Sequence, residues 1–179
     1  IMWRILGRNN LAYHLLLQGD PGAIDYASEG MKIAQEHGVL FFQPFLFSTM
    51  GEISLAHNDL DQAEKYFNDG LALAERTSSP ERIIGLTANL GLVAKARGDT
   101  TLAIHRLSTA LARADALGTQ HLAAQIRLWL IPLLPAHEAR AYLAEVRAIT
   151  EASGRKRLLA EADRLERQLN YPLPPTAGD

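Results

Sequence analysis

Apolar side chains recur three or four positions apart along most of the chain, and short polar turns interrupt them at regular intervals. Between residues 47 and 55 they have the spacing of one helical face: Phe47, Met50, Ile53 and Leu55. Asn58-Asp59 then ends the run, and the Asp59 carboxylate can cap a following helix by accepting a backbone N–H. The pattern therefore predicts pairs of amphipathic helices joined by short turns.

The same organisation returns every 40 residues. Three alanines lie at this interval: Ala23, Ala63 and Ala103. A small residue follows each of them seven positions later: Gly30, Gly70 and Ala110. A turn precedes each of them: Gly19-Asp20-Pro21, Asn58-Asp59-Leu60 and Gly98-Asp99-Thr100. A fixed interval of this size indicates a repeat protein, and small residues at fixed places let two helices cross closely.

We predict an all-α solenoid of helix-turn-helix hairpins in a single domain, residues 1–170. Hairpins are expected at about 4–38, 42–77, 81–117 and 120–152. The fourth is degenerate because Pro132 and Pro135 replace the Gly-Asp turn. A capping helix is expected at 155–170, followed by a disordered tail at 171–179. Because the chain begins Ile1-Met2 and ends in a proline-rich segment, we interpret it as a piece of a longer protein.

Composition narrows the class of protein. The formal net charge of −2 provides no bulk attraction to nucleic acid or to an anionic membrane. Absence of cysteine excludes disulfides and is typical of a reducing compartment, so we expect a cytoplasmic protein. No apolar run approaches the roughly 18 residues of a membrane-spanning helix.

The sequence shows no residue pattern typical of a catalytic or metal site. None of the six histidines forms an i,i+4 pair with an added carboxylate, and no glycine-rich phosphate loop or nucleophile elbow is present. Helix capping explains Asp20, Asp59 and Asp99. The basic run at 154–157 is diluted by three acids and is interpreted as a solvated face: Glu161, Asp163 and Glu166. We therefore expect no enzymatic activity, no cofactor and no metal.

The repeated positions resemble the tetratricopeptide repeat (TPR). In the second unit its motif falls on Phe47, Met50, Gly51, Asn58-Asp59, Ala63, Phe67 and Gly70. In the third unit it falls on Thr87, Leu90, Gly91, Gly98-Asp99, Ala103, Leu107 and Ala110. The resemblance covers about Arg4 to Ala152 and implies a right-handed superhelix. The family period is about 34 residues; the longer period here is similar to the repeats of large bacterial ATPase-linked transcriptional regulators of the maltose-regulator and LuxR type.

In TPR arrays the first helix of each hairpin lines a concave groove. The resemblance places these residues there: Asn10, Tyr13, Phe45, Thr49, Glu52, Asn89 and Leu92, with Lys95 adjacent. Family members that clamp a terminal carboxylate use lysines and arginines at several of these positions, which this chain lacks. The resemblance therefore implies a neutral, partly apolar ligand: a protein segment or a small effector. Alternatively the groove is idle, and Asn10 and Asn89 only satisfy neighbouring backbone groups.

We expect a non-enzymatic interaction module, the effector- or protein-binding region of a larger bacterial transcriptional or signalling regulator, acting on neighbouring domains of the parent chain. A second hypothesis is a self-associating scaffold, such as a homodimer, that uses the Phe41–Phe47 region. This region holds four of the five phenylalanines. An exposed cluster would signal an interface, whereas a buried one would only seal the junction between the first two units.

Overall fold

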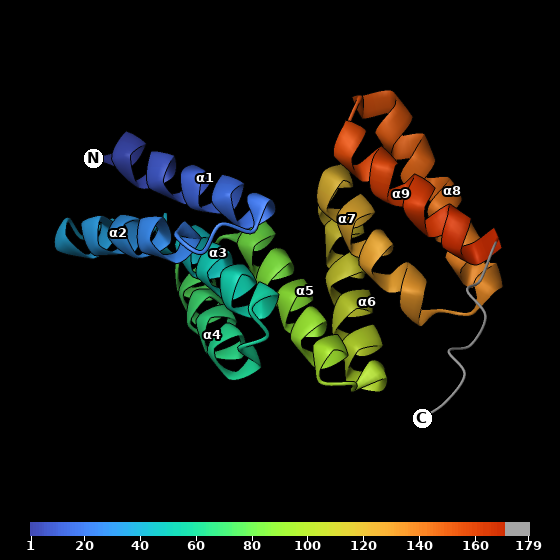
Figure 1. Ribbon diagram of the computed structural model, residues 1–179, viewed down its shortest axis with the longest axis horizontal. Coiled ribbons are helices and arrows are strands. Elements are labelled where there is room, and N and C mark those ends of the chain that lie inside the picture. Colours follow the sequence, from blue (N-terminus) through green and yellow to red (C-terminus); the bar gives the residue numbers. More distant parts are fainter. Residues whose placement is uncertain (171–179) are drawn as a thin grey trace. The chain divides into compact units, whose positions relative to one another are not determined.

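The computed structural model describes residues 1–170, and these form α-helices without any strand, which confirms the predicted all-α class (Figure 1). The helices are α1 (Met2–Gln18), α2 (Ala23–Glu36), α3 (Gln43–Ala56), α4 (Leu60–Arg76), α5 (Pro80–Ala96), α6 (Thr100–Leu117), α7 (Gln120–Leu130), α8 (Ala136–Ser153) and α9 (Lys156–Asn170). One 3-10 turn, η1, covers Ile131–Leu133. The tail predicted at 171–179 lies outside the described residues.

Contacts between residues divide the chain into two compact units, Ile1–Arg106 and the residues from Leu107 onward. The boundary falls inside α6. The single domain expected for residues 1–170 stays a prediction. In the part of the chain that the structure describes, no helix is both long and apolar enough to cross a lipid bilayer.

Helices of the first unit pack in the order of the chain. α1 packs on α2, α3 on α4, and each hairpin contacts the next through α2–α3 and α4–α5 (Figure 1). In addition α1 contacts α3, and α3 contacts α5. The first helices of successive hairpins therefore form one continuous layer, which is the arrangement that stacked repeats require.

Local turn chemistry ends and starts these helices where the pattern predicts. Asn58 and Gly98, one repeat apart, both adopt the left-handed backbone conformation, with φ of 60° and 82°. The next residue then caps the following helix: the backbone N–H of Gln62 donates to Asp59 Oδ1 at 3.2 Å, and that of Leu102 donates to Asp99 Oδ1 at 2.9 Å. Helix capping by these two carboxylates is confirmed.

Asp20 behaves differently from the other two turn aspartates. Its Oδ1 accepts the N–H of Gly22 at 2.8 Å, while α2 begins at Ala23 with Gly22 as its N-cap residue. The helix-capping role predicted for Asp20 is wrong. The first turn has one residue fewer than the others, so the aspartate closes a local turn before the helix starts.

The small residues of the repeat lie where two helices cross closely, as expected. A Cβ built on Gly30 would lie 2.8 Å from Leu46 Cδ2. One repeat later, a Cβ on Gly70 would lie 3.2 Å from Leu86 Cδ2 and 2.8 Å from Phe47 Cβ. The same glycine–leucine contact thus recurs between the second helix of one hairpin and the first helix of the next.

The second unit contains the degenerate hairpin and the end helix. α7 ends in η1 at Pro132, and α8 follows directly after Pro135. α9 packs on both α8 and α7. The apolar stripe predicted for this last helix faces the core: Leu158, Ala162 and Leu165 are buried, and Leu169 packs against them.

Candidate functional site

The residues predicted to line a groove lie on three adjacent helices of the first unit, α1, α3 and α5. Asn10 and Tyr13 belong to α1, and Asn89, Leu92 and Lys95 belong to α5. The intervening α3 carries Phe45, Thr49 and Glu52. We call the side of the layer that carries these residues the first-helix face. Contacts of α3 with both α1 and α5 bring the three sets together, while their role in binding stays a prediction.

Two of these side chains are buried between the helices. Thr49 and Asn89 are each only 4% exposed. Thr49 Oγ1 donates to Asn9 Oδ1 of α1 at 2.9 Å. Asn89 Nδ2 donates to Ser48 Oγ at 3.1 Å and to Glu52 Oε1 at 3.3 Å, both on α3. These hydrogen bonds join side chains of neighbouring helices. The partners of the buried Asn89 amide are therefore side chains of α3.

The remaining predicted residues are more accessible. Tyr13, Phe45, Glu52 and Leu92 are partly buried, whereas Asn10 and Lys95 are exposed. The α1 residue that bonds to Thr49 is Asn9, one position before the predicted Asn10. One residue turns a helix by about 100°, so the two asparagines point in clearly different directions. Alignment on the shorter first turn selects Asn10, whereas the 40-residue interval, which separates Asn9 from Thr49 and Thr49 from Asn89, selects Asn9.

An aromatic cluster lies where α3 begins. The ring centroids of Phe41 and Phe42 are 5.3 Å apart, and that of Phe45 lies 6.1 and 6.2 Å from them. Phe42 packs against the core, whereas Phe41 is 57% exposed and Leu40 before it 46% exposed. The Phe41–Phe47 region therefore both seals the junction of the first two hairpins and leaves an exposed apolar tip.

Arg82 of α5 completes this cluster and was not predicted. Its Cζ lies 4.3 Å from the Phe45 ring centroid, within the range of a cation–π interaction. The pKa of the Arg82 guanidinium is lowered, because burial disfavours its charged form by more than the nearby Glu81 and Glu52 carboxylates favour it. The sequence could have indicated that Arg82 belongs to this face, because Arg82 lies seven residues, or about two helical turns, before Asn89.

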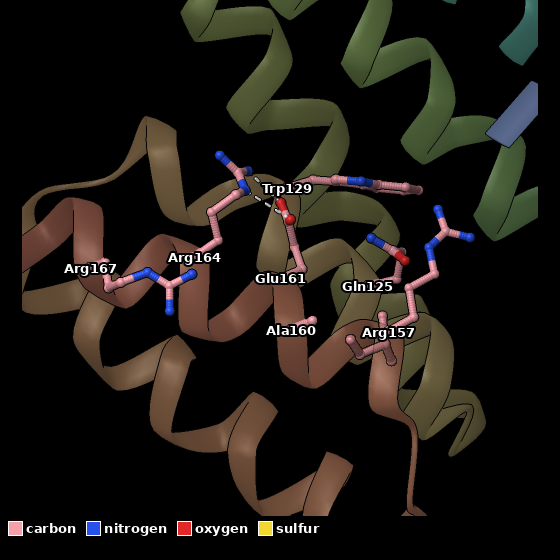
Figure 2. A pocket seen from close by; sticks show the side chains of 8 residues that line it. Gln125, Trp129, Arg157, Ala160, Glu161, Arg164 and Arg167 are labelled. Atoms are coloured by element: carbon pink, nitrogen blue, oxygen red, sulfur yellow. Dashed lines mark hydrogen bonds and ion pairs between the residues drawn. The ribbon is translucent and has the colours of Figure 1, made fainter. Parts of the chain in front are cut away.

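A second candidate site is a cavity of about 540 Å³ between α7 and α9 of the second unit (Figure 2). Its lining consists of Gln125, Trp129, Arg157, Leu158, Ala160, Glu161, Arg164 and Arg167. Arg164 makes two hydrogen bonds to Glu161: Nη2 donates to Oε1 at 2.5 Å, and Nε donates to Oε2 at 2.9 Å. The lining thus combines three arginines, one carboxylate that is bound by Arg164, and a tryptophan, with Arg157 and Arg167 on opposite sides of Glu161 (Figure 2).

The sequence pattern did not indicate this cavity, because Asp163 and Glu166 dilute the arginines along α9. In the structure both carboxylates bind Arg147 of α8, at 2.6 and 2.5 Å. They therefore lie on the side of α9 that packs on α8, apart from the cavity lining. Residues 154–157 are exposed, as expected for a solvated face, and Arg157, the last residue of the run, also lies among the residues that line the cavity.

Comparison with known proteins identifies the fold. No protein-family model matches the chain, and no curated protein matches its sequence. Among solved structures the chain is similar to aspartyl phosphate phosphatase F from Bacillus subtilis, with a TM-score of 0.69 and 18% identity over 93% of this chain. It is also similar to the TPR-like repeats of a kinesin light chain from P. anserina, with a TM-score of 0.52 and 16% identity over 92% of this chain.

The chain spans 46% of the phosphatase and 96% of the kinesin light-chain structure. At these identities the likeness concerns the fold. The chain has a TPR-like helical-repeat fold, as predicted. The finer resemblance to bacterial transcriptional regulators has no counterpart among these structures.

Proposed function

We propose that this chain is a non-enzymatic interaction module that binds a segment of a partner protein on the first-helix face. The observation that carries the proposal is the layer α1–α3–α5, in which side-chain hydrogen bonds join each pair of neighbouring helices. Bonds of this kind hold the backbone in place before a ligand arrives. A preformed surface loses less conformational entropy on binding than a flexible one.

The accessible side chains of the first-helix face suit a neutral, partly apolar segment of a partner protein. Tyr13, Phe45 and Leu92 offer apolar surface along three helices and remain partly accessible. The Arg82 guanidinium lies over the Phe45 ring, and the Glu81 and Glu52 carboxylates offset only part of the burial that lowers its pKa. One partly buried cation beside two acids is not the cluster of lysines and arginines that clamps a terminal carboxylate, whereas an apolar side chain could pack against the accessible rings.

In the wider context, we place the module in the repeat region of a larger bacterial transcriptional or signalling regulator in the cytoplasm. The support is the 40-residue period and its resemblance to the repeats of such regulators. Binding of a protein segment, or of a small effector at the same face, would then alter contacts with neighbouring domains of the parent chain.

Selection from a displayed library of random peptides, with the purified chain as bait, tests the proposal. We expect enriched peptides rich in apolar residues, and at least about tenfold weaker binding to Tyr13→Ala and Leu92→Ala, which corresponds to about 1.4 kcal/mol. Asn68→Ala, an exposed residue of α4, is the matched control. Equal affinity of all three variants for the enriched peptides would exclude this face as the binding surface.

Self-association is a second candidate function, favoured by the exposed Leu40 and Phe41. A cluster of apolar side chains outside the core is typical of an interface. In this alternative the chain forms a homodimer through the tip of the Phe41–Phe47 region. Sedimentation equilibrium distinguishes the cases: a dimer that dissociates in Phe41→Ser supports the scaffold, and a monomer at micromolar concentration argues against it.

A further inference from the structure

We propose that the cavity between α7 and α9 binds a small anionic molecule that carries an aromatic ring, of which a nucleoside 5′-monophosphate is the representative. This site lies in the second unit and is independent of the first-helix face. Its volume of about 540 Å³ falls within the roughly 300–1,000 Å³ of typical small-molecule sites.

The lining of the cavity is cationic. Arg157, Arg164 and Arg167 contribute three guanidinium groups, and Glu161 is the only carboxylate among the lining residues. The acids that would otherwise cancel this charge, Asp163 and Glu166, are bound by Arg147 of α8. Because the planar guanidinium matches a phosphate or carboxylate with two parallel hydrogen bonds, arginines in a concave site favour an anionic group.

Glu161 has a positioning role in this arrangement. Its two oxygens accept both the Nε and the Nη2 hydrogens of Arg164, which fixes the plane of that guanidinium (Figure 2). A guanidinium that is already oriented loses less side-chain entropy when an anion binds to its other edge.

Trp129 supplies the second element of recognition. It comes from α7, is partly buried, and its indole projects into the same space as the Arg157 side chain from α9 (Figure 2). Gln125, one turn earlier on α7, adds an amide donor and acceptor to the lining. A planar base of any identity can stack on the tryptophan ring, and an amide can pair with the polar edge of that base.

The two tryptophans of the chain allow a direct measurement. Trp3 in α1 is 84% exposed and belongs to the first unit, so Trp3→Phe leaves Trp129 as the only indole fluorophore. In this background we titrate adenosine 5′-monophosphate, adenosine and inorganic phosphate separately. We expect saturable quenching by the monophosphate, with at least about tenfold weaker binding of adenosine and of phosphate, since each lacks one of the two recognised groups.

Variants of the lining test the charge contribution. Arg157→Gln and Arg164→Gln should each weaken monophosphate binding by about tenfold, because each removes a charge-assisted hydrogen bond. Arg140→Gln, an exposed position of α8 outside the cavity, is the matched control and should bind as the parent does. Circular dichroism of each variant checks that the fold is intact.

Three results would overturn the proposal. They are an absence of saturable quenching by the monophosphate, equal affinity for inorganic phosphate and the monophosphate, and equal affinity of Arg157→Gln and Arg140→Gln. None of these results bears on the first-helix face, because the titrated site and its variants all lie in the second unit.

Discussion

Phe67 of α4 packs its ring directly onto Gly51 of α3. A Cβ built on that glycine would lie 2.3 Å from Phe67 Cε1 and 2.6 Å from Cδ1. The ring is fully buried, so it has no free volume into which to move. The glycine of the repeat is therefore required by the close approach of an aromatic ring.

Gly51→Ala should destabilise the protein. Overpacking of a dense core costs about 1–3 kcal/mol, which exceeds the gain of at most about 1 kcal/mol from better helix propensity. Urea unfolding followed by circular dichroism measures the change. Gly85→Ala in α5 is the control: no atom lies within 4 Å of its added Cβ, so we expect stabilisation by about 0.5–1 kcal/mol. Destabilisation of similar size in both variants would contradict the argument.

Asn89→Ala should lower the free energy of unfolding by about 1–3 kcal/mol, because Glu52 and Ser48 lose a buried donor. Asn89→Asp should be worse near pH 7, since it places a second carboxylate beside Glu52. Folding then raises the pKa of the introduced aspartate, so its penalty should shrink as the pH falls through that raised value and should be lost below about 4, the ordinary pKa of the group. Unfolding curves near pH 7 and below a pH of about 4 measure the penalty. Asn68→Asp, at an exposed position of α4, is the control. A penalty that does not depend on pH would refute the proximity of the two carboxylates.

Arg127 of α7 is only 11% exposed and binds Asp115 of α6 and Glu145 of α8, at 3.0 and 2.6 Å. Arg127→Ala should cost about 1–2 kcal/mol, because it removes a largely buried side chain together with its ion pairs to two carboxylates that are themselves about half exposed. Arg97 forms exposed ion pairs with Asp61 and Glu64, so Arg97→Ala should change the free energy of unfolding very little. Thermal unfolding of the two variants tests the contrast, and a larger effect at Arg97 would be the opposite of our expectation.

The pH dependence of the Arg127 bridges follows from the direction of its pKa shift. Burial lowers the pKa of this guanidinium, but the hydrogen bonds and charges of Asp115 and Glu145 together raise that pKa above its ordinary value. A raised folded-state pKa contributes stability that is fully present below the unfolded-state value and is lost only as the pH rises through the folded-state value. The difference in stability between the parent and Arg127→Ala should therefore stay constant from neutral to moderately alkaline pH.

Phe45 and Arg82 should be energetically coupled. A double-mutant cycle with Phe45→Leu and Arg82→Gln should give a coupling of about 0.5–2 kcal/mol, the range of a cation–π contact. The cycle compares unfolding free energies of the parent, both single variants and the double variant. Additive effects of the two changes would mean that ring and guanidinium do not interact in solution.

Helices and turns were predictable because their causes are local. Asp59 and Asp99 cap helices through N–H groups three residues away, and Asn58 and Gly98 adopt a conformation set by the turn itself. Of the candidate site, Thr49 and Asn89 could be assigned to the layer between first helices by their place in the repeat. Asn9 follows from the same period, because it lies 40 residues before Thr49, whereas the bond of Asn89 to Glu52 depends on the relative rotation of neighbouring helices.

The sequence by itself determined the repeat, its 40-residue interval and the helical hairpins, since hydrophobic period and turn residues act over only a few positions. Tertiary structure alone decided which charges meet. Arg147 lies 16 residues before Asp163 and 19 before Glu166, and only the docking of α8 on α9 turns these carboxylates away from Arg157. Electrostatic partners depend on distances between elements, and those distances exist only after the helices have packed.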